Sequence, residues 1–293
     1  MKCLCCNSSE LEALHIIDES FGKPLIQCKE CAHIQLEIFP DAEELNTYYE
    51  TTYSESRNMT TTERAFWKHY EERAISQLDY ISGFLDVKDK VKSVCDLGCA
   101  YGVFLQKCSM YVQNVSGYEL DPLCVEYCKK QGLNVSVIND YYSGNTHFDL
   151  TAMSHFLEHI PDIFNLLTLL NNRTRYLFIE IPATDKVYPF GNLGHVHFFN
   201  EKSIFKAIQS SGFEIINISR WGPSFNEYYP HYRIKKIIRR YNLLYNCCTY
   251  LREKWQFFKN GISLFREDAI TVQREGIVKN KHGIWIRILA VAR

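Results

Sequence analysis

The chain has 293 residues, and 46% of them are hydrophobic, which is enough to bury the core of one large domain or two small ones. Its 33 Lys and Arg residues nearly balance its 34 Asp and Glu residues, so the composition excludes a protein that binds a polyanion through bulk positive charge. No run of about 18 apolar residues occurs, and the first residues, MKCLCCNSSE, lack the apolar centre of a signal peptide. We therefore expect a cytoplasmic protein without a transmembrane segment.

The beginning of the chain is rich in cysteine. Of the 12 cysteines, five lie in the first 31 residues, and four of these form two C-x-x-C pairs, Cys3 with Cys6 and Cys28 with Cys31. In a reducing compartment such a cluster indicates a metal site, because each pair can bind an ion from one tight turn and four thiolates complete the tetrahedral shell that zinc accepts. Strand-like segments lie between the pairs, so we predict that residues 1–39 form a zinc ribbon around a structural zinc ion.

Two further features of residues 1–39 bear on this ribbon. Cys5 and His33 are alternative ligands, but neither has the paired spacing. The segment carries three Lys against six Asp and Glu, and this acidic balance argues against a ribbon that grips nucleic acid. We therefore predict a structural or substrate-shaping ribbon and no nucleic-acid partner.

The rest of the chain divides into two parts. Residues 40–92 space their apolar residues three and four apart, which predicts a helical linker or lid, and residues 93–293 alternate strand-like with helix-like runs. The predicted strands are 93–97, 114–118, 134–138, 148–153, 175–181, 213–219 and 284–291, and the predicted helices are 103–111, 121–131, 162–170 and 200–211. This alternation indicates an α/β fold, a doubly wound, Rossmann-like sheet of parallel strands with crossover helices.

The segment VCDLGCAYG ends the first strand of this predicted sheet and leads into a helix. Ligands of open α/β sheets bind beyond the carboxyl ends of the strands, so Asp96, Gly98 and Gly102 are candidate binding residues. The next strand ends in Glu119, 23 residues after Asp96, where an acid typically accepts hydrogen bonds from a ribose. The turn lacks the G-x-G-x-x-G spacing, and Asp96 would repel a pyrophosphate but attract a cation. The pattern therefore favours a nucleoside that carries a sulfonium and an ammonium group.

Three segments in order, VCDLGCAYG, GYELD and FDLTAMSHFLEHIPD, resemble successive motifs of class I S-adenosylmethionine-dependent methyltransferases. The resemblance covers about residues 90–220 and the final strand, and Ala100 departs from it because the family often has a glycine there. It implies S-adenosylmethionine as the cofactor and a seven-stranded sheet. The residues placed at the cofactor are Asp96, Gly98, Cys99, Gly102, Glu119, Leu120, Asn139, Asp140 and Ser154.

The resemblance also implies a role for each position. The backbone of Gly98, Cys99 and Gly102 should line the methionine half, Glu119 should hold the ribose, and Leu120 should pack on the adenine. Asn139 or Asp140 should meet the adenine edge. Ser154 and His155 should face the sulfonium.

The ribbon, the segment PDAEELNTYYETTY and the core together resemble bacterial sugar methyltransferases, including C-methyltransferases of nucleotide-linked deoxysugars. Those enzymes carry a histidine general base in a Tyr-x-Glu-His stretch after the fifth strand, and His195 matches it. Asn192 and Gly194 stand where the tyrosine and the glutamate would be, so two groups that help to stabilise an enolate are missing. We therefore favour a hydroxyl of a nucleotide-linked sugar or phosphate-bearing glycan over a carbon acceptor.

Three histidines are candidates for the base that removes the hydroxyl proton, because imidazole titrates near pH ~6.5. His195 and His197 follow the fifth predicted strand and would point to the same side of an extended segment. His155, after the fourth strand, is the reserve candidate. His159 would share a helical face with His155, but no third metal ligand is visible in the sequence, so we interpret His159 and Glu158 as a structural pair.

An insertion at about residues 221–283 precedes the last predicted strand. Within it, residues 233–259 form a predicted helix with one apolar stripe and many Arg and Lys residues on its other faces. Three roles are open for this basic helix. It can cap the fold with a solvated basic face, form a lid over a phosphate-bearing substrate, or make a peripheral contact with an anionic lipid surface.

Two other functions compete with methyl transfer to a sugar. One is a non-catalytic zinc-ribbon adaptor with a vestigial methyltransferase core, and calorimetry of cofactor binding would distinguish it. The other is a nucleic-acid methyltransferase, which the acidic ribbon disfavours, as does the absence of an Asn/Asp-Pro-Pro-Tyr-type segment after the fourth strand.

Overall fold

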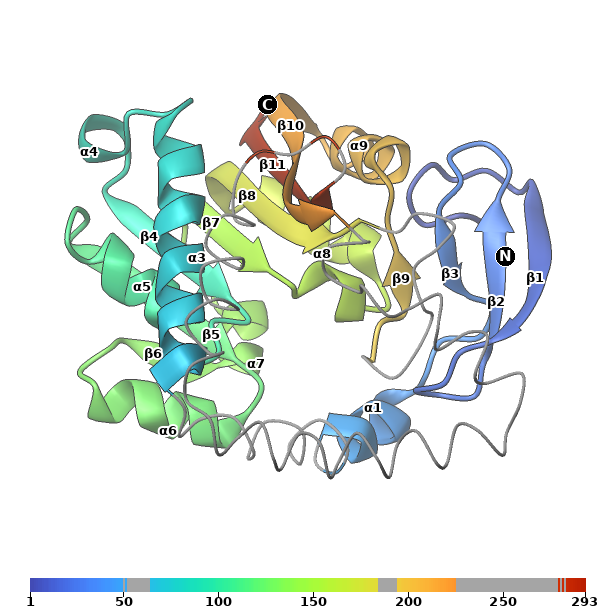
Figure 1. Cartoon of the computed structure of the whole chain (residues 1–293), viewed down its shortest axis with the longest axis horizontal. Helices are drawn as coiled ribbons and strands as arrows, with labels where there is room; N and C mark the ends of the chain where they lie inside the picture. Colours follow the sequence, from blue (N-terminus) through green and yellow to red (C-terminus); the bar gives the residue numbers. More distant parts are fainter. Residues whose placement is uncertain (50, 52–63, 184–193, 225–278, 280, 282) are drawn as a thin grey trace, which may run out of the picture.

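The computed structural model describes residues 1–49, 51, 64–183, 194–224, 279, 281 and 283–293. Its centre is a seven-stranded sheet in the order β10-β11-β8-β7-β4-β5-β6 (Figure 1). The strands are β4 (Ser93–Leu97), β5 (Asn114–Glu119), β6 (Val135–Val137), β7 (Phe148–Ser154), β8 (Thr174–Pro182), β10 (Phe213–Ser224) and β11 (Gly283–Ala292). The strands β4 to β8 pair in parallel, whereas β11 is antiparallel to both of its neighbours.

The predicted α/β architecture is confirmed, and each of the seven predicted strands coincides with an observed one. The predicted helices are α5 (Val103–Cys108), α6 (Pro122–Lys130), α8 (Ile163–Asn171) and α9 (Glu201–Ser210). Two short helices were not predicted, α7 (Ile138–Ser143) and the 3₁₀ helix η2 (Leu157–His159), because one or two turns are too short to give a helical period. Most of the predicted insertion, including the basic helix at 233–259, lies outside the described residues.

Each face of the sheet carries its own hydrophobic core, because successive side chains of a strand point to opposite faces. On one face, α8 and α9 cover residues such as Ile179 and Ile288. On the other face, α3 (Arg64–Ser82), α4 (Val87–Lys90) and α5 cover the intervening residues, such as Phe178 and Leu289. The helix α3 lies within the segment that we expected to be a linker or lid, and it forms one layer of the fold.

The N-terminal residues build a second sheet in the order β1-β2-β3-β9, at one end of the molecule (Figure 1). Its strands are β1 (Leu11–Ile17), β2 (Pro24–Cys28), β3 (Ile34–Leu36) and β9 (His197–Phe198), and all neighbours are antiparallel. β9 is far from the others in sequence, and Phe198 is buried in one cluster with Leu25 and Leu36. The sheet expected from residues 1–39 is therefore completed by a strand that follows β8, which brings the segment around residue 195 to the ribbon.

The helix α1 (Ala42–Tyr48) connects the ribbon to the centre of the molecule. It begins at a capping box, in which the Asp41 carboxylate accepts a hydrogen bond from the Glu44 N–H and the Glu44 carboxylate accepts one from the Asp41 N–H. At its other end Tyr48 is buried against Gly194, where a Cβ would lie 2.5 Å from the Tyr48 ring. Gly194 also has a φ of 67°, which glycine adopts at little cost. Tyr48 thus fixes α1 beside the segment that leads into β9.

Candidate active site and metal centres

A cavity of about 840 Å³ opens where β4, β5 and β7 end. Ligand cavities of about 300–1,000 Å³ are typical of proteins, so this one has room for a nucleoside and part of a second molecule. The glycine half of the cavity is lined from residues 96–104, 119–123 and 138–142. The histidine half is lined from residues 42–49 and 154–161.

The turn after β4 has the backbone geometry that its sequence indicates. Gly98 and Gly102 have φ values of 74° and 70°, in the left-handed region that favours glycine. A Cβ at Gly98 would lie 2.5 Å from the Phe156 ring, so this position also has no space for a side chain. Ala100 adopts a φ of 47° in the same turn, and its N–H donates a 2.7 Å hydrogen bond to Glu119 Oε2. The turn is therefore tied to the end of β5.

Two buried carboxylates face the glycine half. Asp96 is 4% exposed, and its burial, together with the charge of Glu119, raises the pKa of Asp96 well above its usual value. Glu119 is 8% exposed, and its Oε1 accepts hydrogen bonds from the N–H groups of Leu120 and Asp121 at 2.8 and 3.1 Å. This half of the cavity is suited to a cation and unsuited to a pyrophosphate.

The structure brings most of the predicted cofactor residues to this cavity, but not all of them. The predicted residues that line it are Asp96, Gly98, Cys99, Glu119, Leu120, Ser154 and His155. Gly102 is not among them, and it begins α5 just behind the turn. Asn139 and Asp140 lie on α7 with their side chains exposed, away from the cavity lining, and Ile138 and Tyr142 of the same helix line it instead. The Asn139 and Asp140 side chains therefore do not line the cavity, and their contact with an adenine stays a prediction.

A buried ionic network that the sequence analysis missed lies beside Ser154. Glu180 of β8 and Arg287 of β11 are paired across the two strands, both are 0% exposed, and they form an ion pair. Arg73 of α3 binds the same carboxylate and also donates to Ser154 Oγ at 2.9 Å, next to Gln77, which donates at 2.8 Å. Burial opposes ionisation of Glu180, but Arg73 and Arg287 lower its pKa well below its usual value. A single charge inside each of the apolar runs YLFIEIP and GIWIRILAVA is the signal that could have revealed this pair.

His155 is the predicted catalytic histidine that lines the cavity. It follows Ser154 with a φ of 52°, which is unusual for a residue with a side chain and is often found at functional sites. Its Nδ1 lies 3.4 Å from Glu158 Oε1 and its Nε2 lies 4.0 Å from Glu180 Oε1. A buried carboxylate therefore lies beside each of the two ring nitrogens of His155.

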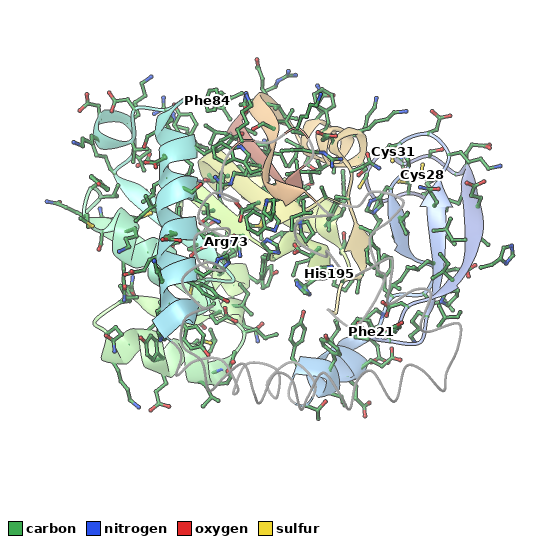
Figure 2. All side chains as sticks on the ribbon, viewed as in Figure 1. Phe21, Cys28, Cys31, Arg73, Phe84 and His195 are labelled. Atoms are coloured by element: carbon green, nitrogen blue, oxygen red, sulfur yellow. The ribbon has the colours of Figure 1, made fainter. Side chains whose placement is uncertain are left out.

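His195 lies elsewhere than predicted. It is 7% exposed and is not among the residues that line the cavity. Its Nε2 lies 3.9 Å from Glu158 Oε1, and its ring stands edge-on to that of His159, with 4.8 Å between centroids. Figure 2 shows His195 beside β9 and Arg73 on α3. The His195 ring therefore does not line the cavity, because the segment before β9 packs against η2, and its role as the base stays a prediction.

His197 is also removed from catalysis by its contacts. It is 1% exposed, its Nε2 donates to the Pro161 carbonyl at 3.1 Å, and its Nδ1 accepts from His33 Nε2 at 3.0 Å. Burial lowers the pKa of His197 to about 3 and that of His33 to about 4, so both rings are neutral. The pair joins the ribbon to the segment after η2, and His33 is not part of the four-cysteine group.

Comparison with known protein families identifies the family to which this chain belongs. Residues 66–218, slightly more than half of the chain, match the model of a family described as a methyltransferase domain. The chain belongs to this methyltransferase family. It is therefore a methyltransferase, and its cavity lies at the carboxyl-terminal edge of the sheet, where ligands of open α/β sheets bind. A comparison with curated protein sequences found no match.

Solved structures similar to this methyltransferase share its fold. Magnesium protoporphyrin IX methyltransferase from Synechocystis PCC 6803, with bound S-adenosylhomocysteine, is 14% identical, with a TM-score of 0.48 over 61% of this chain and 92% of that one. An S-adenosylmethionine-dependent methyltransferase from Mesorhizobium loti is 14% identical, with a TM-score of 0.46 over 74% and 97%. A possible histamine N-methyltransferase from Thermotoga maritima is 13% identical, with a TM-score of 0.47 over 84% and 98%. At these identities the similarity concerns the fold alone.

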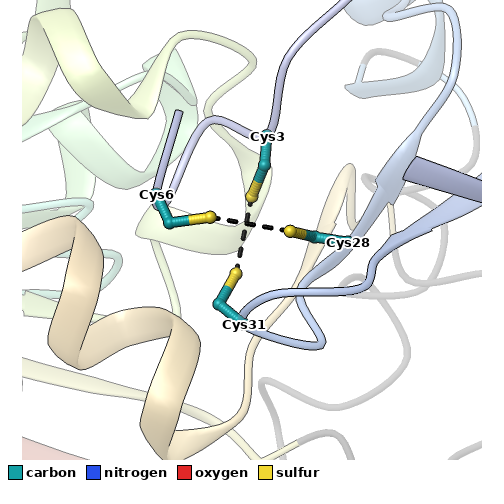
Figure 3. A group of neighbouring side chains, drawn as sticks. All are labelled: Cys3, Cys6, Cys28 and Cys31. Atoms are coloured by element: carbon teal, nitrogen blue, oxygen red, sulfur yellow. Dashed lines mark hydrogen bonds between the residues drawn. The ribbon is translucent and has the colours of Figure 1, made fainter. Parts of the chain in front are cut away.

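The four cysteines of the two C-x-x-C pairs come together in the methyltransferase, and Figure 3 shows their sulfurs converging on one point. The Sγ atoms of Cys3 and Cys31, and those of Cys6 and Cys28, are 3.5 Å apart, and all four lie within 4.8 Å of one another. A zinc ion with Zn–S bonds of ~2.3 Å separates its sulfurs by roughly 3.8 Å, so this arrangement fits zinc closely. Cys5 is buried nearby but stands outside the group.

No helix in the described part of the methyltransferase is both long enough and apolar enough to span a bilayer.

Proposed function

We propose that this enzyme transfers a methyl group to a hydroxyl of a nucleotide-linked sugar or a phosphate-bearing glycan. The observation that carries the reaction type is the position of His155, which lies in the histidine half of the same cavity that has Asp96 and Glu119 in its glycine half. Tyr49 and Tyr70 line the cavity as well, and aromatic rings of this kind stack on the apolar faces of sugars. The resemblance of the sequence to bacterial sugar methyltransferases supports the acceptor class.

We assign the glycine half to S-adenosylmethionine. Two buried carboxylates, Asp96 and Glu119, suit its ammonium and its ribose hydroxyls, since carboxylate oxygens that accept backbone N–H groups retain lone pairs for further bonds. Leu120 and Tyr142 are 45% and 41% exposed at this half and offer apolar surface to the adenine ring. These two side chains replace Asn139 and Asp140 in our assignment.

The methyl transfer itself requires a proton acceptor at the hydroxyl. When bound, S-adenosylmethionine supplies a methyl group whose bond to sulfur breaks with the electron pair left on sulfur. His155 takes the hydroxyl proton as the new bond between oxygen and carbon forms. The carboxylates of Glu158 and Glu180, at 3.4 and 4.0 Å from its ring nitrogens, stabilise the imidazolium that results.

A carbon acceptor is the second candidate, and residue 194 argues against it. Sugar C-methyltransferases have a glutamate at this place, according to the resemblance, where it helps to stabilise an enolate. Here Tyr48 occupies the space into which a side chain at Gly194 would extend. A hydroxyl, which forms no enolate, is the acceptor that this site favours.

We propose that the four cysteines hold one structural zinc ion, which keeps the ribbon folded against β9. None of the ten described cysteines is in a disulfide, as expected in a reducing compartment, so we place the enzyme in the cytoplasm. A mercurial reagent that reacts with thiolates should release one zinc ion per chain, measured with a colorimetric zinc indicator. Release of no zinc from protein purified without chelator would overturn the ribbon assignment.

The acceptor class is tested by incubating the enzyme with labelled S-adenosylmethionine and a panel of nucleotide sugars. Label transfer to a sugar, followed by NMR of the product, would identify the methylated atom and separate O- from C-methylation. Cofactor binding is measured in parallel by calorimetry. Tight cofactor binding without transfer to any sugar in the panel would refute the sugar assignment, and absence of cofactor binding would favour the adaptor hypothesis.

A further inference from the structure

A second cluster of metal-binding side chains lies at the histidine half of the cavity. Glu158, His159 and His195 each present one ligand atom, and these atoms lie within 4.8 Å of one another. Glu158 and His159 belong to η2, and His195 comes from the segment before β9. The sequence does not reveal this group, because its third member is 36 residues away along the chain from His159.

Three hydrogen bonds hold the two segments in register. The Val196 N–H donates to the Glu158 carbonyl at 2.9 Å, His159 Nδ1 donates to the Gly194 carbonyl at 3.0 Å, and His197 Nε2 donates to the Pro161 carbonyl at 3.1 Å. His195 is therefore held facing η2. The bond to Gly194 also fixes the His159 tautomer, with the proton on Nδ1 and the lone pair on Nε2, as in histidines that bind metals through Nε2.

The surroundings of Glu158 indicate a bound cation. It is 1% exposed, and neither carboxylate oxygen has a hydrogen-bond partner among the described residues. Its ion-pair neighbours in the described part of the chain are the rings of His155 and His195, at 3.4 and 3.9 Å, with no Lys or Arg. A buried carboxylate without a fixed cation or donor is costly, and bound metal ions are a usual remedy.

We propose that Glu158, His159 and His195 bind a divalent transition-metal cation at the wall of the cavity. Two imidazole nitrogens and one carboxylate oxygen are a ligand set of catalytic zinc sites, which keep a position for substrate. Metal–ligand distances of about 2.0–2.2 Å bring such atoms to roughly 3–3.5 Å apart, so small side-chain rotations close the site. His159 lines the cavity, and the open position of the cation therefore faces the acceptor.

The cation deepens the proposed function, on which its catalytic role rests. A hydroxyl of the acceptor that occupies the open position becomes more acidic and is held in line for transfer, while its proton still passes to His155. Glu158 Oε1 lies beside both His155 Nδ1 and His195 Nε2, at 3.4 and 3.9 Å, so the carboxylate that binds the cation also contacts His155. A sugar with two adjacent hydroxyls could use both of them as ligands.

The test is a titration of the full-length enzyme with Mn²⁺, followed by the loss of the free-ion signal in electron paramagnetic resonance. Mn²⁺ prefers oxygen ligands such as the Glu158 carboxylate over the soft thiolates of the cysteine cluster, so it reports on this site. We expect one Mn²⁺ per chain, displaced by Zn²⁺. We expect Glu158→Gln and His195→Gln to weaken Mn²⁺ binding at least tenfold. His147→Gln, at an exposed histidine outside the cluster, is the control and should bind like the wild type.

Calorimetry of cofactor binding checks that each variant is folded. A folded variant should keep the wild-type cofactor affinity, because none of the three proposed metal ligands lies in the glycine half. If Glu158→Gln does not fold, His159→Gln takes its place. Wild-type Mn²⁺ affinity in the ligand variants, or no stoichiometric Mn²⁺ in the wild type, would overturn the proposal. Mn²⁺ binding is measured without an acceptor, so a failure of the sugar assignment would leave this result unchanged.

Discussion

The two halves of the cavity are built in different ways. The glycine half comes from one continuous stretch, β4 to α7, in which Gly98 and Gly102 set the turn and Glu119 ties it to the neighbouring strand. The histidine half is lined from α1, α3 and η2, which lie far apart in sequence, and the segment before β9 packs against η2 from outside the cavity. The glycine half therefore depends on local backbone geometry, whereas the histidine half depends on packing between segments that are distant in sequence.

This difference separates the two functions of the enzyme. A cofactor shared by a whole family can be bound by backbone geometry, which tolerates changes of side chain elsewhere. We assign the acceptor to side chains in the histidine half, next to segments that the ribbon and α1 hold in place through Tyr48 against Gly194 and His33 against His197. We therefore expect changes in the histidine half to lower turnover with little effect on cofactor affinity, and changes in the glycine half to do the reverse.

The largest effect should come from His155→Asn. Asparagine tolerates the left-handed backbone of this position but cannot take a proton at neutral pH, so kcat should fall by about 10²–10⁴-fold, as removal of a general base typically gives. The cofactor dissociation constant, measured by calorimetry, should stay within about threefold of the wild type. His147→Asn is the matched control on an exposed histidine and should keep full activity. Full turnover in His155→Asn would mean that another group removes the proton.

The opposite pattern is expected for Glu119→Ala. The Glu119 carboxylate accepts hydrogen bonds from three backbone N–H groups, and we assign it to the ribose hydroxyls. A charge-assisted hydrogen bond to the ribose contributes about 1.5–3 kcal/mol, so cofactor affinity should drop at least about tenfold. Calorimetry measures the change. Glu119→Gln keeps the shape and one acceptor, so its loss should be smaller. An unchanged dissociation constant in Glu119→Ala would show that the nucleoside lies elsewhere.

The same contrast explains how much could be predicted from the sequence. The order of strands and helices and the turn from Asp96 to Gly102 follow from local periodicity and glycine placement, and the structure has them where predicted. The cysteine cluster was also predictable, because two short-range pairs fix its geometry. The position of His195 outside the cavity lining could not be predicted, since it depends on β9 pairing with β3 of the ribbon, a long-range contact without a periodic pattern in the sequence. The joint position of Glu158, His159 and His195 has the same long-range origin.

A third expectation concerns pH and the glycine half. Burial and the charge of Glu119 raise the pKa of Asp96 well above its usual value. Below that pKa the carboxyl is neutral and cannot pair with the ammonium group of the cofactor, and above it the carboxylate can. Cofactor affinity should therefore fall as the pH is lowered through this raised pKa, by at most about tenfold per pH unit for one proton. Calorimetry at several pH values measures the slope. Asp96→Asn should bind more weakly and lose this pH dependence, and an equally steep slope in that variant would contradict the assignment.

The smallest effect should come from Ala100→Gly, which changes the turn and no side-chain contact of the cofactor. Ala100 has a φ of 47°, and a left-handed backbone costs a residue with a Cβ about 1–2 kcal/mol. Glycine removes this strain but loses more entropy on folding, about 0.5–1 kcal/mol, so we expect the free energy of unfolding to rise by up to about 1 kcal/mol. Cofactor affinity should not change, because Ala100 contributes its backbone N–H to Glu119 in either case. Ala207→Gly in the interior of α9 is the control, since there glycine relieves no strain and should destabilise by about 1 kcal/mol or more. Thermal unfolding followed by circular dichroism compares the two, and equal destabilisation by both substitutions would show that the turn is not strained at Ala100.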